Sequence, residues 1–191
     1  MTPSSSSPRT LLRLFAPAWL AARLQAYAPL PMRAIVGYGF LAHGYAKILK
    51  QPEHFAAILH GIGVPAPHLM AWATIAIELG GGLAVLAGAF VPLVAWPMLA
   101  VLLVAMLGVH LPYGFTSIKL MDVVDGVPTF GPPGVETDLL YVAGLLTLAF
   151  GGSGPFALDR RLAPWYARLA GAARGGLSGP SPCFRRWQAR S

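Results

Sequence analysis

Three ionisable residues interrupt apolar stretches at spacings that could bring them together. His43 and Lys47 are four residues apart, so on a helix they share one face. Glu78 lies in the middle of another apolar stretch. Such groups are costly to remove from water unless they are paired, and inside membranes they often mark proton or ligand sites. We therefore expect a Lys47–Glu78 ion pair with His43 beside it, and we take these three as the candidate catalytic residues.

Depth within the predicted helices supports this grouping. At about 1.5 Å per residue, His43 lies about 15 Å and Lys47 about 21 Å beyond Arg33. Glu78 lies about 18 Å from Phe90, at the same end of the neighbouring helix. An antiparallel pair of helices could therefore bring the carboxylate to both side chains. Two interpretations stay open: a proton or ligand site, or a polar clasp that fixes the packing of the two helices.

A second group of polar residues falls near the opposite ends of the predicted helices. His110 comes late in one apolar stretch, and Glu136 and Asp138 open the next. These three are candidate binding residues that could line an outward-facing mouth above the first cluster. For Asp122 and Asp125, in the loop between, the favoured interpretation is contact with water.

The composition predicts that lipid surrounds these residues. Apolar residues make up 55% of the chain and charged residues 11%, where a soluble domain carries roughly 25% charged residues. Spanning a bilayer takes about 20 apolar residues in a helix. Four windows qualify: Met32–Lys50, His68–Phe90, Pro92–Leu111 and Glu136–Gly152. Because no stretch alternates as the strands of a barrel would, the predicted fold class is all-α, an integral membrane four-helix bundle with an N-terminal interfacial helix.

The terminal segments complete the expected organisation. Thr10–Tyr27 mixes apolar and arginine residues, as a helix lying on a membrane surface does. A cleaved signal peptide is the alternative, but Pro17 and Arg23 break up its apolar region. We expect an N-terminal tail and interfacial helix over 1–31, a membrane domain over 32–162, and a basic, partly disordered tail over 163–191.

The distribution of positive charge predicts the orientation. All eleven arginines lie on one side of the predicted spans, four of them at or before Arg33 and seven at or after Arg160, whereas the three lysines Lys47, Lys50 and Lys119 lie toward the other side. Since positive residues concentrate in the cytoplasm, both termini should be cytoplasmic and the loops 51–67 and 112–135 should face outward. The basic tails fit anionic lipid better than nucleic acid. The single cysteine, Cys183, and the spacing of the loop histidines predict no metal site.

Small residues also predict a close helix contact. Gly80, Ala84 and Gly88 recur every four residues, which would let a neighbouring backbone approach closely.

Several short motifs in order resemble the DoxX family of small membrane proteins. They are the run from Gly39 to Lys47, the run from Glu78 to Leu83, His110 with Gly114-Phe115, the run from Gly131 to Tyr141, and the segment from Gly152 to Asp159. The resemblance covers about 32–162. It implies a four-helix inner-membrane protein of the bacterial type. Some relatives are linked to quinone-coupled oxidation of sulfur compounds, and others to membrane complexes that handle oxidative stress.

Three functions follow as hypotheses, and whether the protein is an enzyme stays open. The first is a redox-associated subunit that contacts quinone or a small sulfur compound, with a membrane or soluble redox partner. The second is a non-enzymatic scaffold in which the buried charges only specify packing. The third, a small proton-coupled transporter, is less favoured, because four helices would need a homo-oligomer.

Overall fold

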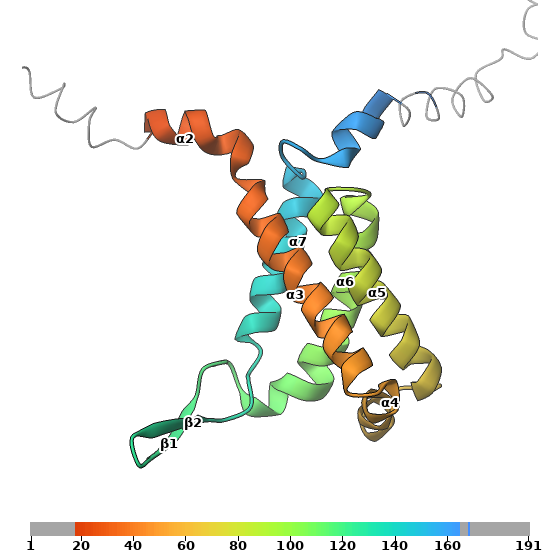
Figure 1. Ribbon diagram of the computed structural model, residues 1–191, viewed down its shortest axis with the longest axis vertical. Helices are drawn as coiled ribbons and strands as arrows, with labels where there is room; N and C mark the ends of the chain where they lie inside the picture. Colours follow the sequence, from red (N-terminus) through yellow and green to blue (C-terminus); the bar gives the residue numbers. More distant parts are fainter. Residues whose placement is uncertain (1–17, 165–167, 169–191) are drawn as a thin grey trace, which may run out of the picture.

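The computed structural model describes residues 18–164 and residue 168 of the 191-residue chain. The predictions made for the first seventeen residues and for the tail that carries Cys183 lie outside the described residues. Within the described part of the N-terminal segment, α2 (Ala18–Leu24) is followed by the short 3₁₀ helix η1 (Gln25–Tyr27). Figure 1 shows α2 turning sideways from one end of the bundle.

Four longer helices form the body of the protein (Figure 1). They are α3 (Pro29–Leu49), α5 (Pro67–Ala87), α6 (Val91–Ala105) and α7 (Glu136–Gly151). Their order and positions agree with the four predicted windows. The helix α3 begins three residues before the predicted Met32, because proline suits the first turn of a helix, where its missing N–H is not needed.

Two of the helical segments are long and apolar enough to cross a membrane. These are Pro67–Ala87 and Val91–Tyr113. The second combines α6 with a π-helical turn, η2 (Met106–His110), and a 3₁₀ turn, η3 (Leu111–Tyr113). The chain is therefore a mainly helical protein with two membrane-spanning candidates among its described residues.

The bundle is apolar inside and outside. Its core contains buried aliphatic and aromatic side chains from all four helices: Val36, Phe40, Val85, Met98, Leu145 and Leu148. Large apolar side chains also cover its outer surface, each more than half exposed: Ile35, Tyr38, Leu83, Trp96, Leu140 and Phe150. Exposed apolar surface of this extent fits lipid contact better than contact with water.

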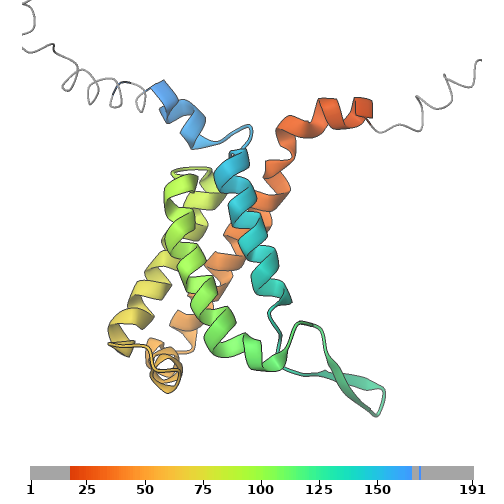
Figure 2. The same cartoon turned by 180° about the vertical axis from the view of Figure 1, so that it is seen from behind.

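The helix α4 (Pro52–Gly61) was not expected, and it lies in the loop that joins α3 to α5. Figures 1 and 2 show it at the end of the bundle opposite α2. Its buried side chains Ala56 and Leu59 pack with Ala71 of α5 in a second small core. A positive φ at Gln51 and at Ala66 turns the chain at the two junctions that flank this segment.

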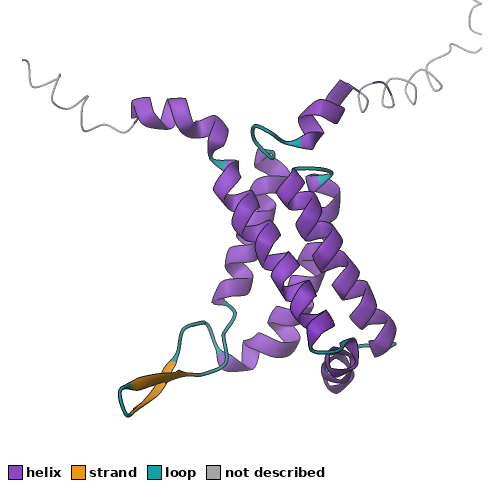
Figure 3. Ribbon diagram, in the orientation of Figure 1, coloured by secondary structure: helices purple, strands orange, loops and turns teal. Residues whose placement is uncertain are grey.

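The all-α prediction needs a correction at the loop between α6 and α7. There β1 (Leu120–Val124) and β2 (Val127–Phe130) pair as an antiparallel hairpin with Val124 opposite Val127. Asp125 and Gly126 both have positive φ and form the two-residue turn. Figure 3 shows this hairpin projecting from the helical body.

The predicted small-residue row is only partly right, because an added Cβ at Gly88 would come within 2.8 Å of Arg33 and Ala157 whereas Gly80 faces open space. A Cβ on Gly80 would meet nothing within 4 Å, so this residue mediates no close contact. The close approach of one helix backbone to another occurs two residues further along, at Gly82. An added Cβ there would come within 2.8 Å of the Gly37 carbonyl oxygen in α3. Gly82 and Gly37 therefore let α5 and α3 cross backbone to backbone.

Candidate functional site

Lys47 and Glu78 form the ion pair expected from their spacing. The Nζ atom of Lys47 lies 2.6 Å from Oε1 and 2.7 Å from Oε2 of Glu78. The side chain of Glu78 is only 6% exposed and that of Lys47 19% exposed. The pair joins α3 to α5 at the level where Gly44 of α3 packs against Glu78 and Leu79.

An aromatic ring from α4 covers the cation. The Nζ atom of Lys47 lies 4.8 Å from the centre of the Phe55 ring, a favourable cation–π distance. Phe55 is therefore a site residue that the sequence analysis missed. Its spacing with Ile58, Leu59 and Ile62 is typical of an amphipathic helix, and this signal could have revealed α4.

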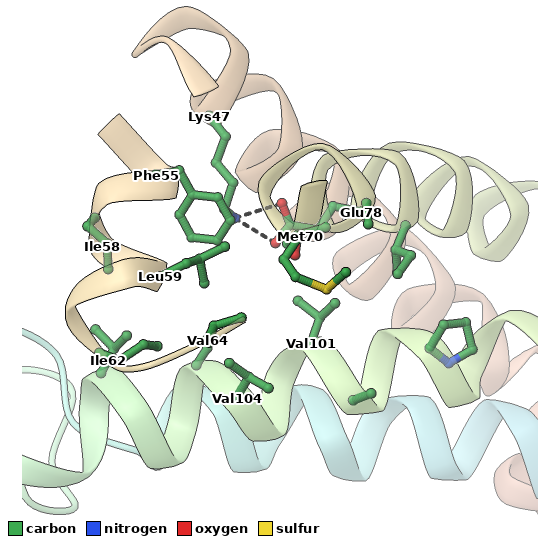
Figure 4. Close-up of a pocket in the computed structure, with 17 residues that line it drawn as sticks. Lys47, Phe55, Ile58, Leu59, Ile62, Val64, Met70, Glu78, Val101 and Val104 are labelled. Carbon is green, nitrogen blue, oxygen red and sulfur yellow. Dashed lines mark hydrogen bonds and ion pairs between the residues drawn. The ribbon is translucent and has the colours of Figure 1, made fainter. Parts of the chain in front are cut away.

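A cavity of about 290 Å³ opens beside the ion pair, as Figure 4 shows. Apart from Lys47, Glu78 and Thr74, its walls are apolar. Most of the apolar lining comes from three helices, with Phe55, Ile58 and Leu59 on α4, Ile77 on α5, and Val101 and Val104 on α6. A space of this kind suits an apolar molecule or chain better than a charged metabolite.

A second cavity, also about 290 Å³, adjoins the first on the α7 side. Both cavities are lined by Lys47, Phe55, Glu78 and Ala105, so they meet at the ion pair. The second cavity is more polar: its lining adds His43, His110, Asp138 and Tyr141. Together the two cavities form a chamber with one aliphatic and one polar compartment.

His43 lines the polar compartment without bonding to the ion pair. Its ring meets that of Tyr141 edge to face, with centroids 6.4 Å apart. Tyr141 also packs edge to face on Phe40, at 5.7 Å. Tyr141 itself was missed, although a tyrosine one helical turn beyond Asp138 lies on the same face of α7.

His110 and Asp138 form a second pair in the same compartment. The Nδ1 atom of His110 lies 2.6 Å from Oδ2 of Asp138. The Asp138 side chain is 8% exposed and the His110 side chain 26% exposed. His110 ends the π-helical turn η2, a form of local helix widening that is frequent at functional sites. The pair links the end of α6 to the start of α7.

Glu136 lies outside this chamber. Its Oε2 atom accepts a hydrogen bond from the backbone N–H of Ser117 at 2.9 Å. The Ser117 hydroxyl in turn donates to the Gly134 carbonyl and accepts from the Thr137 N–H. Glu136 therefore holds the loop that precedes the hairpin, and the structure does not bring it together with His110 and Asp138.

Arg33 has a structural role that its position in the sequence did not predict. It was counted as a surface charge, but it is buried and donates to four carbonyl oxygens: those of Val85, Leu86, Ser153 and Pro155. Two of these acceptors, Val85 and Leu86, lie in the last turn of α5, where backbone carbonyls lack the usual N–H partner four residues further along; the Val85 carbonyl also accepts from the Gly88 N–H. Nearby, Asp159 accepts hydrogen bonds from the N–H groups of Phe90 and Val91 at the start of α6. A cation and an anion thus stabilise the two helix ends of the α5–α6 turn.

An apolar helical bundle with buried ion pairs between its helices is typical of helical membrane proteins. The model of the DoxX family matches residues 28–111, from the start of α3 to the end of η2, so this part of the chain belongs to the DoxX family. The match confirms the resemblance to the DoxX family noted in the sequence. No curated protein and no solved structure matches the chain.

Proposed function

We propose that this protein is a four-span inner-membrane protein that binds a lipid-soluble quinone in the chamber beside Lys47 and Glu78. The single observation that carries the proposal is the chamber itself. An aliphatic compartment adjoins a polar one, with a buried ion pair where they meet. A quinone has a matching form, since a ring with two carbonyl oxygens carries a long apolar chain.

The four-span topology rests on the outward faces of α3 and α7. Although neither reaches the length and hydropathy of the two strongest spans, both pack in the bundle with α5 and α6 and expose large apolar side chains. Their charged residues turn inward: Arg33 and Asp138 are buried. An arrangement with apolar side chains outward and charged side chains inward is unfavourable in water and favourable in lipid. If the arginine-rich ends lie on the cytoplasmic side of the membrane, both termini are cytoplasmic, and α4 and the hairpin lie on the outer side.

The direction of access also supports a lipid-soluble ligand. The aliphatic compartment lies between α4, α5 and α6, next to side chains that face outward from the bundle, such as Val104 and Ile58. A molecule dissolved in the outer leaflet could enter there without crossing water. The small sulfur compounds handled by some relatives are a second ligand class, but they leave the aliphatic compartment unused.

A quinone titration tests the proposal. Decylbenzoquinone is titrated into the protein in lipid nanodiscs, and the quinone-dependent quenching of tryptophan fluorescence is followed. Glu78→Gln removes the anion that positions the Lys47 side chain where the two compartments meet, so we expect saturable binding to be lost or weakened at least about tenfold. Glu53→Gln makes the same change on the exposed face of α4 and should bind as the wild type does. Thermal unfolding establishes that each variant is folded.

The second candidate is a non-enzymatic scaffold. It is favoured by the fact that every buried side-chain N or O atom among the described residues has a hydrogen-bond partner, as a purely structural polar network requires. Absence of quinone binding in the folded wild-type protein would move the conclusion to this scaffold, and partners would then be sought by co-purification. Proton-coupled transport has no comparable observation in its favour.

A further inference from the structure

The polar compartment contains the hydrogen-bonded pair His110–Asp138, in which the second ring nitrogen of His110 has no described partner. An ionised Asp138 carboxylate can only accept, so Nδ1 of His110 carries the hydrogen in their 2.6 Å contact. The other ring nitrogen, Nε2, makes no hydrogen bond to any described residue. In neutral His110 this Nε2 has a lone pair and no hydrogen, whereas in protonated His110 it is a donor.

The other polar groups of the chamber are poorly placed to donate to a ligand. The Lys47 ammonium is taken up by both oxygens of Glu78 and covered by Phe55. His43 has no carboxylate bonded to its ring among the described residues. Asp138 lies behind His110 and offsets the charge that its ring would gain.

A ligand oxygen in this compartment would therefore meet different groups depending on its own chemistry. A carbonyl oxygen only accepts hydrogen bonds, so beside the Nε2 lone pair of neutral His110 it would place two acceptors together. A hydroxyl group can donate to that lone pair. Only the carbonyl gains from protonation of His110.

We propose that the His110–Asp138 pair makes quinone binding take up a proton. This inference rests on the proposed quinone site and deepens it. When a quinone carbonyl approaches Nε2, a proton from solvent forms the new Nε2–H bond, and that N–H donates to the carbonyl oxygen. Asp138 remains an anion and stabilises the imidazolium. The corresponding hydroquinone binds to neutral His110 through its hydroxyl and takes up no proton.

Charged and titratable groups face this compartment from each of four elements. They are His43 and Lys47 on α3, Glu78 on α5, His110 on η2, and Asp138 and Tyr141 on α7. Lys47 and Glu78 neutralise one another, which leaves His43 as the main competitor of His110. The two histidines can be tested by the same substitution.

The experiment measures dissociation constants between about pH 5.5 and 8.5 for decylbenzoquinone and its hydroquinone, in nanodiscs under nitrogen. For the wild type we expect quinone binding to weaken by up to about tenfold per pH unit in the upper part of this range. Hydroquinone binding should stay level. Equal slopes for the two ligands would overturn the proposal, and this comparison needs no variant.

Two variants then show which histidine causes the pH dependence of quinone binding. His110→Asn supplies a permanent amide donor that does not titrate, so quinone binding should lose its pH slope. His43→Asn should keep the slope. A slope that persists in folded His110→Asn would overturn the assignment to this pair while leaving the quinone site intact. No quinone binding by the wild type at any pH would instead refute the proposed function, and this inference with it.

Discussion

At the scale of single residues, the free energy of the site depends on pairing. Lys47 and Glu78 lie between helices with little access to solvent, so each is tolerable only while the other is present. Lys47→Met should leave an uncompensated carboxylate and lower the free energy of unfolding by about 3 kcal/mol. The double variant Lys47→Met with Glu78→Leu should recover most of that loss. Thermal unfolding in one detergent measures both, and an unchanged midpoint for the single variant would show that the ion pair does not stabilise the fold.

Arg33 illustrates a cation used for structure. Its guanidinium reaches four carbonyl oxygens on two segments, at distances of 2.6 to 3.2 Å. Lysine keeps the charge but cannot spread donors over such a fork. We expect Arg33→Lys to lower the unfolding temperature clearly, whereas Arg23→Lys, on an exposed side chain, should not change it. Equal unfolding temperatures would show that the four hydrogen bonds contribute little.

At the scale of elements, the crossing of α3 and α5 determines where the chamber lies. Gly82→Ala should destabilise the protein by about 1–3 kcal/mol, because the new methyl group meets the Gly37 carbonyl oxygen. Gly80→Ala is the matched control two residues away. There the added methyl group meets open space and should be neutral or stabilise the helix by up to about 1 kcal/mol. The reverse ranking in denaturation experiments would mean that the helices cross elsewhere.

Some of the helices and strands could be predicted from the sequence and others were missed. Hydropathy was enough for the four long helices, and helical spacing was enough to pair Lys47 with Glu78. The helix α4 and the hairpin were missed although both carry local signals, an amphipathic spacing after Pro52 and the Asp125-Gly126 turn.

Other features had no local signal. Arg33 reads as a surface charge because its four acceptors are backbone atoms from distant parts of the chain. The His110–Asp138 bond depends on a π-helical turn that reorients the end of α6, and no spacing rule gives that turn. The grouping of Glu136 with these residues failed for a related reason. Neighbours on α7 point in different directions, and Glu136 faces the Ser117 loop.

At the scale of the whole molecule, the proposed topology can be checked by labelling. Cysteines are introduced singly at His60 on α4, Val127 on the hairpin and Arg160 beyond α7, in a chain whose Cys183 is replaced by serine. We expect an impermeant maleimide to label the first two in intact cells and Arg160→Cys only after permeabilisation. The opposite pattern would invert the orientation, and labelling of all three from outside would refute the four-span arrangement.

We propose that a quinone occupies the chamber between α3, α4, α5, α6 and α7. Ala105 lines both compartments, whereas Leu103 on the same helix is largely exposed and lines neither. The most direct test is to fill the space and titrate decylbenzoquinone into folded protein in nanodiscs. We expect Ala105→Phe to weaken binding at least about tenfold, equivalent to about 1.4 kcal/mol, and Leu103→Phe to leave it unchanged. Equal affinity in the two folded variants would show that the quinone does not bind in this chamber.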